Sequence, residues 1–129
     1  MIVGSQVEGA LSVVPENKAV SNGTKSVVLR CHSDMDVSKV IQSDISWSRR
    51  LVAEKTYSQV LAHGCSVVPQ FQSVYTATSD VLGQCDLTIN TVDTSLTGVY
   101  SCENRQDQTA SAYVTVIGQL FNMLLYTVS

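Results

Sequence analysis

The sequence predicts an all-β protein in which two antiparallel sheets pack face to face as a sandwich. Short stretches rich in Val, Thr and Ser recur along the 129 residues, and turn residues separate them. No long stretch repeats its apolar residues at the helical period of 3.6. A chain of this length suffices for one domain with a full hydrophobic core. We therefore expect a single domain over residues 1–118, followed by an apolar tail at 119–129.

The expected strands follow from the alternation of apolar and polar residues. In residues 25–33, Val27, Leu29 and Cys31 share one face. Pro15 interrupts the first expected strand, which favours an edge position because proline cannot donate to the hydrogen-bonded ladder. The expected strands cover residues 9–20, 25–33, 44–50, 56–64, 71–80, 84–90, 98–104 and 111–118.

The four cysteines indicate disulfides rather than a metal site. None of them shows the CxxC spacing of a zinc site, and only two histidines are present. An even number of cysteines in a strand-rich chain predicts two disulfides and an oxidising compartment. The sequence alone allows three pairings.

Four residues form the most specific pattern in the chain: Cys31, Trp47, Tyr100 and Cys102. The tryptophan lies between the cysteines, and the tyrosine precedes the second cysteine by two residues. This order resembles the immunoglobulin superfamily over residues 6–117, and the long interval between the cysteines is similar to that of variable-type (V-set, antigen-receptor-like) domains. The resemblance implies a Greek-key sandwich with a Cys31–Cys102 bond between sheets about 10 Å apart. It also implies that Trp47 packs on this bond and that the Tyr100 hydroxyl returns to the chain upstream.

Leu96 indicates that the chain is a divergent member of this type. V-set domains usually carry an aspartate at this position, paired with an arginine that corresponds here to Val74 or Tyr75. We expect both partners to be replaced by apolar groups, because losing only one would leave a buried charge unpaired. Leu96 is then a core residue. The sequence also lacks the Phe-Gly-x-Gly motif of rearranging receptors, which favours a germline-encoded receptor.

The second cysteine pair is less typical of the family. Cys85 shares a face with Leu87 and Ile89 and begins a central strand, while Cys65 follows the strand expected at 56–64. A Cys65–Cys85 bond would fix the segment that crosses between the sheets. The alternative is that one of these cysteines links to another chain.

No catalytic set, cofactor site or metal site is expected, so we predict that the protein is not an enzyme. The eight Lys and Arg residues against eleven Asp and Glu give a net charge of −3. Without a basic stripe to neutralise phosphates, nucleic acid is not an expected partner. Function is therefore expected to reside in a binding surface.

The first expected binding surface is the outer face of one sheet, through which V-set domains commonly pair. We expect it to bind a protein partner, including a weak homodimer, with Arg50 and Glu103 as charge partners. The side chains placed there by alternation are Ser48, Arg50, Val99, Ser101, Glu103 and Tyr113.

The second expected surface is formed by loops, including residues 33–43, 62–67 and 103–109, with Arg105 and Asp107 as ligand-binding side chains. Two alternatives to a sheet-face receptor follow. One is a secreted effector that binds microbial carbohydrate through these loops, and the other is a structural spacer without a ligand. A change in the loops would abolish carbohydrate binding, whereas Arg50→Ala would not.

Two further features suit a secreted or cell-surface protein. Asn22-Gly23-Thr24 is an N-glycosylation sequon within an expected turn, so Asn22 is an expected glycosylation site. The tail at 119–129 is too short to span a bilayer, so contact with a membrane is expected only through segments outside this chain. The expected location is extracellular.

Overall fold

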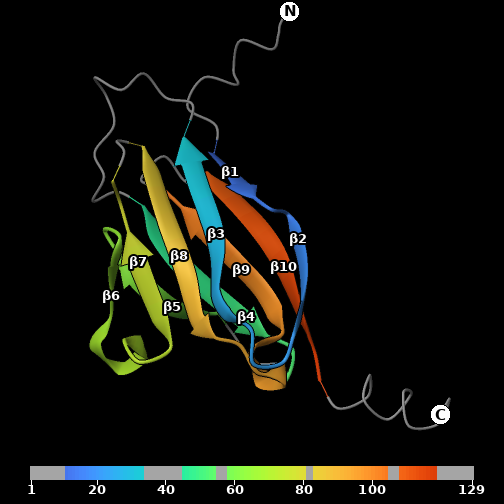
Figure 1. Ribbon diagram of the computed structural model, residues 1–129. Coiled ribbons are helices and arrows are strands. Elements are labelled where there is room, and N and C mark those ends of the chain that lie inside the picture. The colour runs from blue at the N-terminus through green and yellow to red at the C-terminus, as the bar shows by residue number, and fades with distance from the viewer. Residues whose placement is uncertain (1–10, 34–44, 55–57, 81–82, 105–107, 119–129) are drawn as a thin grey trace, which may run out of the picture.

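The computed structural model describes residues 11–33, 45–54, 58–80, 83–104 and 108–118. These residues form an all-β sandwich of two sheets, as predicted (Figure 1). None of the described segments forms a helix with the length and apolarity needed to cross a membrane. The strands are β1 (Leu11–Val14), β2 (Asn17–Ser21), β3 (Lys25–Ser33), β4 (Ser46–Leu51), β5 (Gln59–His63), β6 (Ser66–Val67), β7 (Tyr75–Thr78), β8 (Gln84–Thr91), β9 (Gly98–Glu103) and β10 (Thr109–Ile117).

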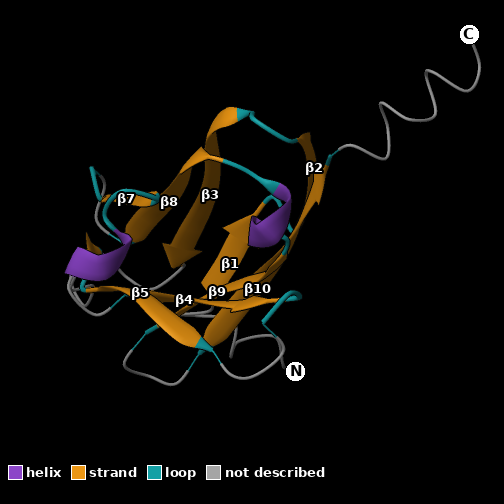
Figure 2. Cartoon of the chain, turned by 90° about the horizontal axis from the view of Figure 1, so that it is seen from below, coloured by secondary structure: helices purple, strands orange, loops and turns teal. Residues whose placement is uncertain are grey.

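The two sheets divide the strands unequally. One sheet has the order β1-β3-β8-β7, and the other has the order β2-β10-β9-β4-β5-β6. Seen from below, β5, β4, β9 and β10 lie in one layer, opposite β3, β8 and β7 (Figure 2). The inner faces meet in one apolar core, because every second residue of the central strands is buried, as in β3 at Val27, Leu29 and Cys31.

The first expected strand becomes two strands that belong to different sheets. β1 pairs with β3, and after Pro15 the chain crosses to the other sheet, where β2 pairs with β10. β2 and β10 run parallel, so the prediction of a purely antiparallel sandwich is wrong at this edge. The physical reason is that the chain changes sheets at Pro15 without reversing its direction. Proline has no N–H that the crossing would leave unpaired.

Both disulfides have the predicted pairing. Cys31–Cys102 joins β3 to β9 across the core, and Cys65–Cys85 joins the turn after β5 to β8. No cysteine is free. Two intramolecular disulfides fit an oxidising environment.

The predicted core residues are buried and hydrogen bonded. Trp47 is fully buried opposite Cys102 on the neighbouring strand, and its indole N–H donates to the carbonyl oxygen of Cys85 at 3.2 Å. The Tyr100 hydroxyl donates to the carbonyl oxygen of Leu96 at 2.8 Å, which confirms the expected return of this side chain to the upstream chain. The Leu96 side chain is itself buried.

The region between β5 and β7 differs most from the sequence prediction. Gly64 and Cys65 have φ angles of 57° and 60°, which form a tight two-residue turn that pairs β5 with the unpredicted strand β6. Pro69–Phe71 then forms a short 3-10 helix, so β7 begins at Tyr75 rather than at Phe71. The alternation rule does not detect a strand as short as β6, because two residues cannot show a period.

Candidate binding face

The outer face of the six-stranded sheet is the candidate binding face. We use this name for the outward side chains of β10, β9, β4 and β5. Along these strands the intervening residues, such as Trp47, Tyr100 and Val114, are buried in the core. Their neighbours in sequence must therefore project outward. Among the described residues, no second layer of secondary structure packs on this side of the sheet (Figure 2).

The strand register brings all six predicted sheet-face side chains onto this face. Arg50 pairs with Val99, which pairs with Tyr113 on its other side. Ser48 pairs with Ser101 in the next row. Glu103 lies in a third row, opposite Ser46 and Thr109.

The centre of the face is small and polar, and its surroundings are partly apolar. The hydroxyl oxygens of Ser101 and Ser111 are hydrogen bonded at 2.7 Å. Tyr113 is 40% exposed, and Val60, the partner of Ser48 on β5, is 43% exposed. Small central side chains let another surface approach closely, and the exposed apolar groups offer area to bury.

Val60 was missed by the sequence prediction. Leu61 and Ala62 are both buried although they are adjacent, so the strict alternation fails in β5. The cause is an irregularity in the register between Trp47 and Ser48 of β4, which shifts the pairing with β5 by one residue. Only the pairing with β4 places Val60 on the outer side.

Arg50 and Glu103 are exposed, and neither has an ion-pair partner within the described part of the chain. Glu103 lies four positions along β9 from Val99, the partner of Arg50, so the two charges lie about 13 Å apart along the strands. They do not neutralise each other within one molecule. Both are available to opposite charges on a partner.

A buried series of hydrogen-bonded polar side chains lies beneath this face. Arg49 is only 8% exposed and points inward. Its Nε donates to Oε1 of Gln59 at 2.9 Å, and its Nη1 donates to the Tyr75 hydroxyl at 2.8 Å. The guanidinium carbon lies 4.5 Å from the centre of the Phe71 ring, in the geometry of a cation–π contact. Glu54 lies at the solvent side, with its Oε2 3.9 Å from Nη2 of Arg49.

The series of hydrogen bonds continues from Tyr75 to Tyr100 and ends at Leu96. The two hydroxyl oxygens are 3.0 Å apart, and Tyr100 donates its only hydroxyl proton to the Leu96 carbonyl. Tyr75 must therefore be the donor to Tyr100, so every hydrogen bond runs in one direction from Arg49. Burial raises the pKa of the Tyr75 hydroxyl, and burial together with the neighbouring Tyr75 raises the pKa of Tyr100 further.

This series of hydrogen bonds corrects the expectation that apolar groups at positions 74 or 75 and 96 replace the ion pair usual in V-set domains. Position 75 carries a hydroxyl that accepts from a buried arginine, and Leu96 contributes its carbonyl oxygen together with its apolar side chain. The cation is supplied by Arg49 of β4 instead. Arg49 follows Trp47 by two residues, so alternation places both on the inner face. An inward arginine was the signal in the sequence that points to a buried polar network.

The other predicted site residues lie elsewhere. Arg105 and Asp107 fall outside the described residues, as does most of the loop expected at 33–43. Asn22 is exposed in the turn between β2 and β3, where its Oδ1 accepts from the Thr94 amide at 3.1 Å. Its glycosylation stays a prediction. In the part of the chain that the structure describes, no three His, Cys, Asp or Glu side chains gather as a metal site.

Comparison with protein-family models finds no match to this chain, and comparison with curated proteins finds no significant relative. The fold and the candidate binding face are therefore the features from which function can be inferred. Among these features, the exposed face carries the charges of both signs, Arg50 and Glu103, that have no ion-pair partner within the described residues.

Proposed function

We propose that this chain is a variable-type immunoglobulin-like recognition domain. In such domains a sheet of four strands packs on a second sheet that carries additional edge strands. The orders β1-β3-β8-β7 and β2-β10-β9-β4-β5-β6 support this assignment, because they correspond to that division. The disulfide between Cys31 and Cys102 and the Tyr100 hydrogen bond support it further.

The domain recognises a protein partner through the candidate binding face, as part of an extracellular receptor or adhesion molecule, and a second copy of the chain is the first partner to test. The observation that carries this proposal is the pair of exposed, unpaired charges Arg50 and Glu103 on either side of a small serine centre. A face with one charge of each sign can be complementary to itself after a two-fold rotation. Two disulfides and the exposed sequon at Asn22 support an extracellular location.

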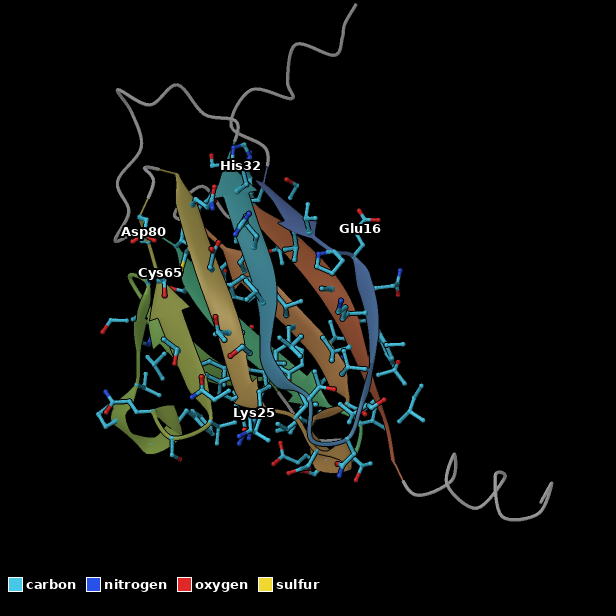
Figure 3. The ribbon with its side chains drawn as sticks, viewed as in Figure 1. Glu16, Lys25, His32, Cys65 and Asp80 are labelled. Carbon is cyan, nitrogen blue, oxygen red and sulfur yellow. A yellow bond between two sulfur atoms is a disulfide. The ribbon has the colours of Figure 1, made fainter. Side chains whose placement is uncertain are left out.

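Sedimentation velocity over a wide dilution series tests self-recognition. The variants are Arg50→Glu on the candidate binding face and Lys25→Glu, an exposed position on the opposite sheet, which changes the net charge equally (Figure 3). Wild type and Lys25→Glu are expected to form a reversible dimer. Arg50→Glu is expected to remain monomeric, because it places like charges opposite each other in both symmetry-related contacts.

Two outcomes would contradict the proposal of self-recognition. One is a wild-type monomer at every concentration. The other is equal loss of the dimer in Arg50→Glu and Lys25→Glu, which would assign the effect to overall charge rather than to this face.

A further inference from the structure

The two disulfides differ in their access to solvent. Cys31, Cys102 and Cys85 are each 0% exposed. Cys65 is partly exposed and lies at the margin of the sandwich, beside β7 and β8 (Figure 3). Of the four cysteines, only Cys65 is therefore open to a reagent from solution while the protein stays folded.

A hollow of about 280 Å³ lies beside Cys65. Ser66 and Val67 of β6 line one side, and Thr76 and Ala77 of β7 line the other. Thiol–disulfide exchange requires that the attacking sulfur reach one sulfur of the bond. The hollow provides a route of approach to Cys65, whereas the interior contains the other three cysteines.

The backbone at Cys65 favours opening of this bond. Cys65 has a φ of 60°, a left-handed conformation that non-glycine residues rarely adopt. The short β6 holds the turn through only two register pairs with β5, while the disulfide ties it to the long central strand β8. Opening the bond removes the covalent link between this turn and β8.

We propose that Cys65 is a site of thiol exchange. A low-molecular-weight thiolate of the glutathione class attacks Sγ of Cys65, and a new sulfur–sulfur bond forms between the two. The Cys65–Cys85 bond breaks, and its electron pair goes to Sγ of Cys85, which takes up a proton from solvent. The product carries a mixed disulfide on Cys65 and a buried thiol at Cys85, while Cys31–Cys102 remains intact.

The experiment exposes the folded protein to millimolar glutathione at mildly alkaline pH, followed by alkylation of free thiols and peptide mass mapping. Glutathione is expected on Cys65 and the alkyl group on Cys85. This opening should be at least about tenfold faster than that of Cys31–Cys102, and low urea concentrations should leave its rate unchanged, because local opening does not require global unfolding.

A pair of exposed serines provides the matched control. Ser66→Trp places a bulky ring at the hollow and should slow adduct formation severalfold, whereas Ser58→Trp, remote from the hollow, should not. The proposal is overturned by equal rates at both disulfides, by glutathione on Cys85 instead of Cys65, by no adduct, or by a rate that rises with urea as global unfolding does. Equal rates in the two tryptophan variants would likewise exclude the hollow as the route.

Discussion

Arg49 and Arg50 are adjacent on β4, yet they occupy opposite environments. Arg49 is 8% exposed and takes part in a hydrogen-bonded chain that reaches Leu96, whereas Arg50 is exposed and has no ion-pair partner within the described ranges. The pleat of the strand alone creates this difference, because successive side chains project to opposite faces. The same residue type can thus belong to the buried interior at one position and to the exposed surface at the next.

The comparison extends to the two faces of the same strands. On the inner face of β9, Tyr100 and Cys102 are fixed by a hydrogen bond and a disulfide. On its outer face, Val99 and Ser101 have no comparable constraint from the core. Substitutions on this outer face can therefore accumulate while the sandwich beneath it keeps its structure.

The largest difference is expected between Arg49→Ala and Arg50→Ala. Arg49→Ala removes two hydrogen bonds from a charged donor, one to the buried Tyr75 hydroxyl and one to the half-buried Gln59, so it should lower the free energy of unfolding by about 3 kcal/mol. Arg50→Ala should change it by less than about 0.5 kcal/mol, as expected for an exposed site. Urea denaturation measures both. Equal losses would show that the two positions are not divided between fold and surface.

A smaller effect is expected when a tyrosine hydroxyl is removed from the series of hydrogen bonds that runs from Arg49 to Leu96. Tyr75→Phe leaves an Arg49 donor without its acceptor, and Tyr100→Phe leaves the Leu96 carbonyl without its donor. Each should cost about 1–2 kcal/mol. Because the two hydroxyls are hydrogen bonded to each other, the double variant should lose less than the sum of the two single variants. Strict additivity in a double-mutant cycle would contradict a connected chain.

Alkaline pH tests the same hydrogen-bonded tyrosines without changing how their side chains pack. The folded protein holds the Tyr75 and Tyr100 protons above the usual pKa of a tyrosine, which is about 10. Stability is therefore fully present below about pH 10 and falls as the pH rises above it, because the unfolded chain then binds fewer protons than the folded one.

The slope can reach about 1.4 kcal/mol per pH unit for each buried tyrosine. Denaturant titrations between neutral and alkaline pH should give a shallower decline for the variant that combines Tyr75→Phe with Tyr100→Phe than for wild type. An unchanged slope would show that these two hydroxyls are not responsible for the loss of stability.

The sequence was sufficient for the parts of the fold that depend on repeated alternation. Val27, Leu29 and Cys31 are buried as predicted, and the positions of Trp47, Tyr100 and both disulfides agree with the structure. β6 and the start of β7 were not predicted, because positive φ angles at Gly64 and Cys65 and a turn of 3-10 helix determine them locally.

The candidate binding face was predicted less completely than the core. Alternation placed Arg50, Val99 and Tyr113 on one side correctly. Val60 could not be placed, since the pairing between β4 and β5 shifts at Trp47. The link from Arg49 to Tyr75 was also out of reach, because it joins strands of different sheets and no local pattern records such a contact.

The smallest effect is expected when the proposed charge contacts are exchanged between two variants. If two copies meet with their strands antiparallel, a two-fold axis through the serine centre brings Arg50 of each copy near Glu103 of the other. Arg50→Glu and Glu103→Arg should each remain monomeric, because like charges then meet. An equimolar mixture restores both opposite-charge contacts and should form a heterodimer.

Each restored contact is exposed and contributes about 0–1 kcal/mol, so the Kd of this heterodimer should lie within about tenfold of the wild-type value. Fluorescence anisotropy with one labelled variant measures it. Arg50→Glu mixed with wild type is the control and should bind with intermediate strength, because one contact attracts and the other repels. A mixture that stays monomeric while wild type dimerises would exclude the antiparallel arrangement. Arg50 and Glu103 would then not contact each other across this two-fold axis.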